Sequence, residues 1–384
     1  MANRRSFLQG IGTLALARGL SGCAPAESAL RVFLLEGSIP PRLIQDFQKT
    51  IEDRNLKFQS ETKLQNLLKL LEAWRQRSIP TPASSFPVAL PFTGKSSSPR
   101  ANLVTLGDAW LASAIRERLI EPIEPARLTN WSKLPPRWRS LVTRDEQGFP
   151  NETGKIWGAP YRWGSTVIVY NEDKFKRFDW RPEDWSDLWR EELTGRIALV
   201  DNPREVIGLT LKKLGGSYNP TDLDRVPDLT SNLLSLQKQV KFYSSSYYLQ
   251  PLLVGDVWLS VGWSDDILPV TEQYREMKLV VPRSGTSLWS DVWVQPAMMA
   301  NDPLADRWID FCWKTNSVDR ISLFTDGLSP MVIDRPAGEL PVDIRKDPLL
   351  ADRPALEKSE FLLPLAPKVE KEIDRLWEKM RRST

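Results

Sequence analysis

Histidine is absent from the 384-residue sequence. This absence excludes catalytic Ser-His and Cys-His pairs, as well as zinc or heme sites built on imidazole ligands. Acid–base chemistry near neutral pH would therefore depend on carboxylates. Cysteine is scarce as well, since Cys23 and Cys312 are the only two. After the N-terminal region, no apolar run reaches the roughly 18 residues of a membrane-spanning helix. The sequence therefore predicts no membrane-spanning helix in that part of the chain.

The charges nearly cancel: 52 Lys and Arg residues oppose 49 Asp and Glu residues. The first 23 residues hold three of the arginines and no acid, so the rest of the chain carries 49 charges of each sign. A neutral chain lacks the basic surface of a nucleic-acid-binding protein. The composition, 41% hydrophobic and 26% charged, is typical of a folded globular protein. Tryptophan is abundant, with 16 residues, and its ring can contact methylene chains and cations.

The N-terminal region resembles a targeting signal. Residues 3–9, Asn-Arg-Arg-Ser-Phe-Leu-Gln, resemble a bacterial twin-arginine export signal, and residues 11–20 are apolar but too short to span a bilayer. Residues 20–23, Leu-Ser-Gly-Cys, resemble a lipobox. The resemblance implies that residues 1–23 are a lipoprotein signal peptide and that Cys23 becomes lipidated. We therefore expect export in the folded form and a lipid-anchored protein in the periplasm or cell envelope. The alternative is a frayed N-terminus with a chance cysteine.

Strand-like apolar runs alternate with segments of helical periodicity. Strands are expected at residues 30–35, 56–59, 102–106, 155–170 (two strands joined by a turn), 196–200, 257–261 and 278–281. Helices are expected at residues 40–51, 64–74, 110–119, 184–190, 206–214, 229–239, 304–315 and 369–380. Residues 78–100 are rich in proline and serine, which predicts a loop. Residues 120–150 are rich in proline and show little periodicity, which predicts irregular structure. The alternation predicts α/β lobes with mainly parallel sheets.

Six segments, in this order and spacing, resemble the spermidine/putrescine-binding proteins of bacterial ABC importers. They are residues 158–164 (Gly-Ala-Pro-Tyr-Arg-Trp-Gly), 185–189 (Trp-Ser-Asp-Leu-Trp), 201–206 (Asp-Asn-Pro-Arg-Glu-Val), 255–258 (Gly-Asp-Val-Trp), 262–266 (Gly-Trp-Ser-Asp-Asp) and 285–291 (Gly-Thr-Ser-Leu-Trp-Ser-Asp). The resemblance implies a type II periplasmic-binding-protein-like fold, with two discontinuous α/β lobes, crossover strands and a ligand cleft between the lobes. Lobe 1 is expected to comprise residues 24–160 and 285–330, and lobe 2 residues 161–284 and 331–384.

Trp289 and Asp291 are the first candidates for the ligand site. A polyamine needs carboxylates at its ammonium groups and flat apolar walls along its methylene groups. Residues two apart in an extended segment point to the same face, so the pair can line one wall. The resemblance implies that Trp289 stacks on the ligand and that Asp291 binds an ammonium group. The alternative is a tryptophan packed in the core beside a solvated aspartate.

Trp263 and Asp266 form the second candidate pair. They follow the strand expected at residues 257–261, at the carboxyl end where α/β sheets usually bind ligands. The resemblance implies an aromatic ligand contact at Trp263 and, in some members, a ligand-binding carboxylate at Asp266. The alternative is that Asp265 and Asp266 only cap the next helix.

Glu205 is the third candidate carboxylate, because the resemblance implies ligand contact there. Its alternative role is a capping box with Asn202, which precedes a proline suited to the first helical position; some family members carry a ligand-binding acid where Asn202 stands. In the first lobe the sequence departs from the family, which usually has an aromatic and a small hydroxyl residue after the first strand. Glu36 and Asp108 stand at such first-lobe positions and add negative charge, which suits a cation.

Three further residues are expected to pack within the protein: Trp110, Trp163 and the Cys312 thiol. The expected function is therefore the lipid-anchored, polyamine-binding component of an ABC importer, a monomer without enzymatic activity, cofactor, metal or nucleic-acid partner. Its partners would be the ligand, the membrane, and a permease with its ATPase. A separate ATPase is expected because the sequence has no phosphate-binding glycine loop of its own. The alternatives are a same-fold receptor for an amino-acid-like, thiamine-like or peptide ligand, and a carboxylate-pair glycosidase, for which no hydrolase signature is found.

Overall fold

The computed structural model describes residues 30–51, 55–77, 100–299 and 301–383. The predicted signal peptide with Cys23, and all but the last residue of the loop predicted at 78–100, lie outside the described residues. No helix in the described part of the chain combines the length and the apolar character needed to cross a bilayer.

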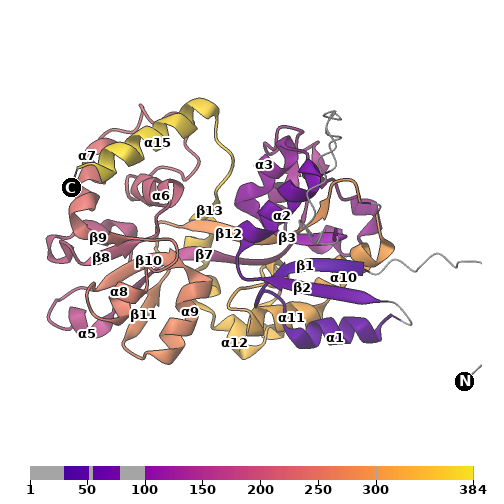
Figure 1. The fold of residues 1–384 in the computed structure, drawn as a ribbon. Coiled ribbons are helices and arrows are strands. Elements are labelled where there is room, and N and C mark those ends of the chain that lie inside the picture. The colour runs from indigo at the N-terminus through magenta and orange to yellow at the C-terminus, as the bar shows by residue number, and fades with distance from the viewer. Residues whose placement is uncertain (1–29, 52–54, 78–99, 300, 384) are drawn as a thin grey trace, which may run out of the picture.

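Two long strands, β7 (Ala159–Asn171) and β12 (Ser287–Pro296), run through the middle of the molecule and join its two halves (Figure 1). The main sheet has the strand order β2-β1-β3-β12-β7-β10-β8-β9. One half of the sheet contains β1 (Leu30–Leu35), β2 (Leu56–Glu61) and β3 (Leu103–Gly107). The other half contains β8 (Ile197–Leu199), β9 (Val240–Tyr243) and β10 (Leu259–Trp263), with β11 (Met277–Val280) also paired to β7.

The sheet is parallel within each half and antiparallel where the halves meet. β1 pairs with β2 and β3 in parallel, and β8 pairs with β9 and β10 in parallel. β12 is antiparallel to both β3 and β7, and β7 is antiparallel to β10. The expectation of mainly parallel sheets is thus confirmed for each half, whereas the central pairing differs from it. Parallel neighbours within a half are joined by helical crossovers. β7, in contrast, leads the chain from the first half to the second and β12 leads it back, so these two neighbouring strands run in opposite directions.

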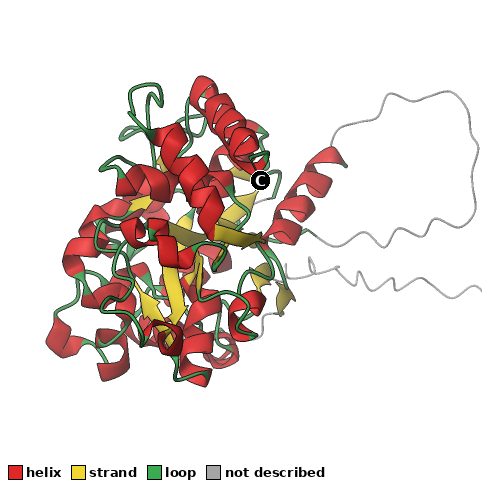
Figure 2. Ribbon diagram, turned by 90° about the vertical axis from the view of Figure 1, so that its left-hand side faces the viewer, coloured by secondary structure: helices red, strands yellow, loops and turns green. Residues whose placement is uncertain are grey.

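Helices cover both faces of the strands, as the side view shows with helices in red and strands in yellow (Figure 2). The half with β1 carries α1 (Pro41–Lys49), α2 (Leu64–Gln76), α3 (Leu111–Arg116), α10 (Pro303–Cys312) and α11 (Thr315–Phe324). The half with β8 carries α6 (Pro203–Lys213), α7 (Leu229–Gln239), α9 (Ser264–Gln273) and α15 (Pro367–Arg381).

The predicted elements overlap the observed ones, but β9, β12 and several helices were not predicted, and two of these helices show why. Residues 120–150 were expected to be irregular, but they contain α4 (Pro136–Val142), which buries Trp138 and Leu141. The N–H group at the first position of a helix has no partner within the helix, so a proline costs no hydrogen bond there. The proline content of this segment therefore does not prevent a helix. No helix was predicted at α11, where Val318 and Ile321 give only one buried pair at helical spacing.

The chain crosses between the halves a third time after α11. α12 (Val342–Arg345) contacts α11 in the first half, whereas α15 contacts α6 and α7 in the second. Val369, Ile373 and Leu376 form the buried face of α15, at the spacing of an amphipathic helix. The division of the chain at residues 160, 284 and 330 stays a prediction, but these contacts place the return to the second half between α12 and α15.

Candidate functional site

The pairing of the two crossover strands places Trp289, Asp291 and Arg162 on one face of the sheet. Asp291 lies opposite Arg162 in the antiparallel ladder, and Trp289 lies opposite Gly164. Residues that are directly opposite in such a pair share a face. Gly164 leaves room for the indole, because a Cβ atom at this position would lie 2.3 Å from Cζ2 of Trp289. The structure therefore brings Trp289 and Asp291 together on one wall, as the sequence predicted.

Arg162 occupies the space between these two side chains. Its Nη1 donates to Oδ2 of Asp291 at 2.8 Å, and its Nη2 donates to Oδ2 of Asp265 at 3.1 Å. Nε and Nη2 also donate to the carbonyl oxygen of Thr325, at 3.1 and 2.8 Å. The guanidinium carbon lies 5.1 Å from the centre of the Trp289 ring, within the range of a cation–π contact. Arg162 therefore links both halves of the molecule to the crossover strands.

Both members of this buried ion pair are charged at neutral pH. Arg162 is 4% exposed and Asp291 is 1% exposed. Burial opposes the charge of Arg162, but the carboxylates of Asp291 and Asp265 raise the pKa of Arg162 above its usual value. Burial raises the pKa of Asp291 to about 6, although the charge of Arg162 acts in the opposite direction. A buried charge is tolerated where a partner of opposite sign satisfies it.

Trp263 and Asp266 lie where β10 ends and α9 begins. The Tyr248 hydroxyl donates to Oδ2 of Asp266 at 2.8 Å and accepts from the backbone N–H of Trp263 at 3.1 Å. Loss of water around the carboxyl group, followed by the charge of Asp265, raises the pKa of Asp266, although the residue as a whole is exposed. Asp265 and Asp266 lie in the first turn of α9, but their side chains contact Arg162 and Tyr248 instead of the helix N-terminus.

Glu205 is turned toward the chain's own hydroxyl groups. The side-chain oxygen of Asn202 accepts from the backbone N–H groups of Arg204 and Glu205, at 3.0 and 3.4 Å. This confirms Asn202 as the N-cap of α6. The carboxylate of Glu205, however, accepts from the Ser287 hydroxyl at 2.5 Å instead of returning to Asn202. Burial raises the pKa of Glu205, while its hydrogen bond from Ser287 lowers it. The same hydrogen bond links α6 to the start of β12.

The two first-lobe acids occupy different environments. Asp108 is 3% exposed, and its Oδ1 accepts from the backbone N–H of Ser290 at 2.8 Å, next to Asp291. Burial raises the pKa of Asp108 to about 7, against the hydrogen bond from Ser290. Glu36 lies exposed after β1, and its carboxylate joins none of these hydrogen bonds. The structure therefore gathers Asp108 at the crossover strands but leaves Glu36 apart.

The residues expected to pack do so. Trp163 is fully buried against Trp138, with ring centres 5.4 Å apart. Trp110 is partly buried against the same core, and Cys312 is a buried free thiol.

Arg162 and Tyr248 are the contacts that the sequence interpretation missed. Arg162 stands within residues 158–164, one of the segments that carry the resemblance, but no role was assigned to it. A signal was available: Arg162 is the only charged residue in the run 159–170. A lone charge in a strand that is otherwise apolar and small implies a buried partner of opposite sign. Tyr248 carries no such signal, because its contacts, Asp266 and the backbone of Trp263, lie 15 to 18 residues later in the sequence.

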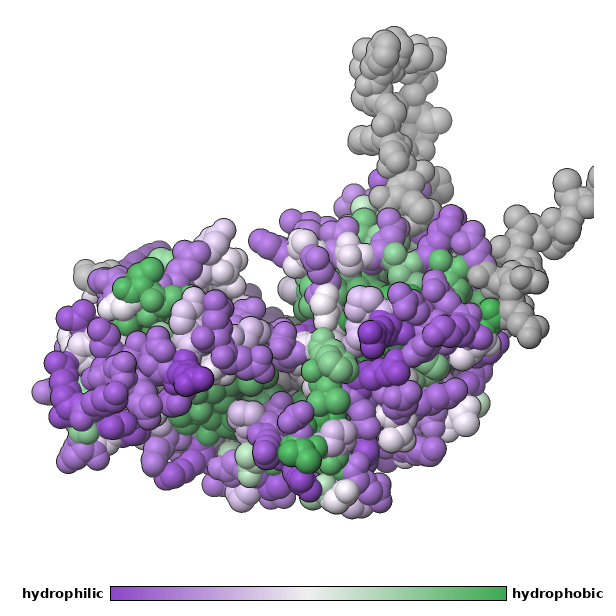
Figure 3. All heavy atoms as spheres, turned by 90° about the horizontal axis from the view of Figure 1, so that it is seen from below, coloured by the Kyte–Doolittle hydropathy of each residue, from purple (hydrophilic) through white to green (hydrophobic). Residues whose placement is uncertain are grey.

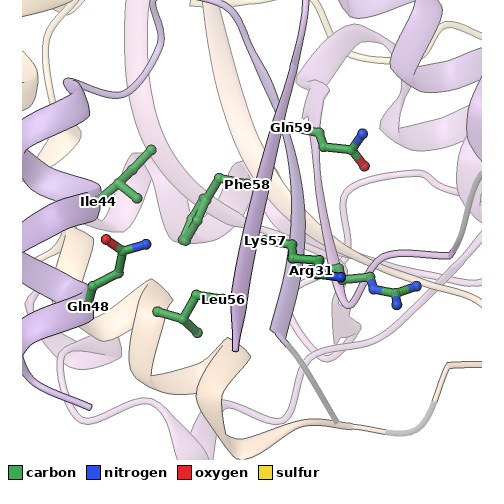
Figure 4. A pocket seen from close by; sticks show the side chains of 7 residues that line it. All are labelled: Arg31, Ile44, Gln48, Leu56, Lys57, Phe58 and Gln59. Carbon is green, nitrogen blue, oxygen red and sulfur yellow. The ribbon is translucent and has the colours of Figure 1, made fainter. Parts of the chain in front are cut away.

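The surface seen from below shows the two halves joined along one side, with a notch between them on the other (Figure 3). A second hollow, of about 590 Å³, lies elsewhere, between α1 and the edge strand β2 (Figure 4). Its lining includes Arg31 and Lys57, and none of the seven side chains drawn there is a carboxylate. The carboxylates gather at the junction of the halves, so this second hollow does not fit a cationic ligand.

Comparison with known proteins identifies relatives. The spermidine/putrescine-binding periplasmic protein of Escherichia coli K12 is 28% identical over 221 residues, which is 58% of this chain and 61% of that protein. The putrescine-binding periplasmic protein PotF of the same organism is 24% identical over 297 residues, 73% of this chain and 78% of that protein. The alignment thus spans less than two thirds of the first relative.

The fold agrees with solved structures. The spermidine/putrescine ABC transporter substrate-binding protein PotD of Streptococcus pneumoniae superposes with a TM-score of 0.75 at 20% identity, covering 92% of this chain and 99% of that one. This confirms the expected two-lobed α/β fold. Residues 98–349 match the sequence profile of bacterial extracellular solute-binding proteins, a family of binding proteins and not of enzymes. The chain belongs to the bacterial extracellular solute-binding protein family.

Proposed function

We propose that this chain is the substrate-binding component of an ABC importer and binds a protonated amine of the putrescine/spermidine class between its lobes. The observation that carries the proposal is the charge at the junction of the halves. Asp265 and Asp291 bind the guanidinium of Arg162, and a third carboxylate, that of Asp266, follows Asp265 at the start of α9. The surplus of negative charge there suits a cationic ligand, and it opposes a phosphate or another anion.

The proposed ligand contacts are Trp263, Asp266 and Trp289. Trp263 and Trp289 are half-buried and Asp266 is exposed, so a ligand can contact all three from solvent. Two predicted ligand residues, Asp108 and Glu205, are buried and satisfied by Ser290 and Ser287. We propose that these two hold the wall behind the site in place, whereas Asp291 is paired with Arg162 and Glu36 lies apart from these contacts.

These groups supply enough free energy for a useful affinity. A micromolar complex needs about 8 kcal/mol. A hydrogen bond between an ammonium group and a carboxylate contributes roughly 1.5–3 kcal/mol, and a cation over an indole ring adds about 0.5–2 kcal/mol. The methylene groups of the ligand add about 0.8 kcal/mol each when they are buried. The names of the relatives, which bind spermidine and putrescine, agree with this chemistry.

Thermal unfolding in the presence of a ligand panel tests the proposal. A ligand at about 100 times its dissociation constant stabilises the folded state by about 2.7 kcal/mol, so putrescine or spermidine is expected to raise the Tm by a few degrees. Butane-1,4-diol, which lacks the charges, is the matched control and is expected to give no shift. A shift with an amino acid, thiamine or a peptide but with no polyamine would instead identify a same-fold receptor for that ligand.

Asp266→Asn tests the proposed carboxylate. The amide oxygen can still accept from Tyr248, so the fold is retained while the negative charge is lost. We expect most of the polyamine-dependent Tm shift to disappear. Asp256→Asn is the control, since Asp256 is an exposed carboxylate of the same half and pairs with Lys241 at the surface. A shift that persists in Asp266→Asn would reject this assignment.

We also propose twin-arginine export and a lipid anchor at Cys23. The sequence of residues 3–23 supports both, as described above. Cys23→Ala is expected to move the protein from the membrane fraction to the soluble fraction, and Arg4→Lys with Arg5→Lys is expected to retain the precursor inside the cell. Fractionation followed by immunoblotting measures both. Membrane association that persists in Cys23→Ala would exclude the anchor.

A further inference from the structure

The contacts of Arg162 resemble those that a ligand ammonium group would make. A cation in this slot would lie over the Trp289 ring and donate to the carboxylate of Asp291. Arg162 does both, with its guanidinium carbon 5.1 Å from the ring centre and Nη1 2.8 Å from Oδ2. Oδ2 of the buried Asp291 and the face of the ring that contacts Arg162 are thus already occupied by a cation of the chain itself.

Arg162 is held in this position from several directions. Its Nη2 reaches Asp265 on α9, and the carbonyl oxygen of Thr325 accepts from both Nε and Nη2. Gly327 leaves room for the side chain, because a Cβ atom at that position would lie 2.7 Å from Nε. An ammonium group that displaced the guanidinium would leave a buried cation without its partners, which is strongly unfavourable.

We propose that Arg162 is a specificity-determining residue: a built-in cation that fills the ammonium position between Trp289 and Asp291. The site then recognises one charged end of its ligand, at Asp266, and offers no carboxylate at Asp291 to a further ammonium group. The ligand is a short amine, such as a diamine, and a triamine gains nothing from its additional charge. This inference rests on the proposed function and specifies which amines it concerns.

Isothermal titration of the whole protein with putrescine and spermidine tests the inference. In the parent protein the two dissociation constants are expected to agree within about threefold. Arg162→Ala frees Trp289 and Asp291, so we expect spermidine to bind at least tenfold more tightly than to the parent, with a smaller change for putrescine. Adding Asp291→Asn to Arg162→Ala is expected to abolish this gain. Arg162→Lys keeps a cation in the slot and is expected to behave like the parent.

Asp291→Asn alone provides a test that does not require Arg162→Ala to fold. Asp291 contacts Arg162 and not the ligand, so putrescine affinity is expected to fall much less than it does in Asp266→Asn. A loss as large as that of Asp266→Asn would overturn the inference, as would a parent protein that prefers spermidine by more than tenfold. A failure of every amine to bind any of these proteins would instead overturn the proposed function, and this inference with it.

Discussion

Arg162 shows how a single residue changes the meaning of a recognised pattern. Trp289 and Asp291 match the positions that the family resemblance assigns to ligand binding, and they do lie on one face. The resemblance does not reveal that a third side chain lies between them, because Arg162 is 127 positions before Trp289 in the sequence. Only the register of β7 against β12 brings these residues together, and a sequence interpretation without that register could not predict the ion pair.

Gly164→Ala is expected to displace the Trp289 ring. The added methyl group would lie 2.3 Å from Cζ2 of Trp289 and 2.4 Å from the hydroxyl oxygen of Ser264. Overpacking of this kind costs about 1–3 kcal/mol, which urea unfolding would measure, and polyamine binding is expected to weaken with it. Gly338→Ala is the control, because a Cβ atom at that position meets nothing within 4 Å. Equal stability of both variants would show that the ring moves freely.

Asp108→Asn is expected to change how stability depends on pH. Burial raises the pKa of Asp108 from 3.8 to about 7, so the folded state keeps a proton that the unfolded state has released. The contribution of Asp108 to stability therefore falls as the pH rises from about 4 to 7, by about 1.4 kcal/mol per pKa unit.

The asparagine oxygen still accepts from the N–H of Ser290 but does not titrate. Relative to the parent, the variant should gain Tm steadily between pH 4 and 7 and gain no more above pH 7. Melting curves across this range measure the difference. A difference in Tm that is independent of pH would contradict the raised pKa.

Among the elements, those with strong local signals were predicted best. The strand expected at residues 30–35 and the helix expected at residues 229–239 match β1 and α7 residue for residue. β12 was recognised only as an extended segment around Trp289 and Asp291, because its ten residues are almost all buried and show no alternation. Its pairing with β3 and β7 depends on distant parts of the chain. Local pattern therefore predicts most elements here, whereas the antiparallel centre of the sheet requires the tertiary structure.

The C-terminal helix α15 gives a test at this scale. Leu376 is 5% exposed on the face that packs against α6 and α7. Leu376→Ala is expected to destabilise the protein by about 2–5 kcal/mol, through lost burial and the cavity that remains. Lys379→Ala, on the exposed face of the same helix, should change stability by less than about 0.5 kcal/mol. Chemical unfolding curves would compare the two variants, and similar losses would mean that α15 does not seal the second core.

The whole molecule consists of two halves that share one sheet, and Arg162 spans them. Asp265 belongs to α9 in one half, Thr325 follows α11 in the other, and Asp291 lies on a crossover strand. A ligand that contacts both halves favours the closed arrangement by its difference in affinity between the open and closed states. The predicted division into two lobes matters for this closure, because the lobes would move relative to each other about the crossover strands.

Small-angle X-ray scattering tests this motion. Saturating putrescine is expected to reduce the radius of gyration of the parent protein, while butane-1,4-diol leaves it unchanged. The Asp266→Asn variant is expected to remain in the open state, with a larger radius of gyration, at the same putrescine concentration. An unchanged radius of gyration in the parent, at a concentration where calorimetry shows saturation, would mean that the ligand binds without closure.

The position of β12 in the middle of the sheet has a consequence for the timing of biosynthesis. β3 and β7 leave the ribosome well before residues 287–296, which must later insert between them. Until then two strand edges lack their neighbour, and α6 and α7 lack the cover that residues 367–381 provide. The twin-arginine export that we propose, which would carry the protein folded, would therefore have to wait until nearly the whole chain has been synthesised.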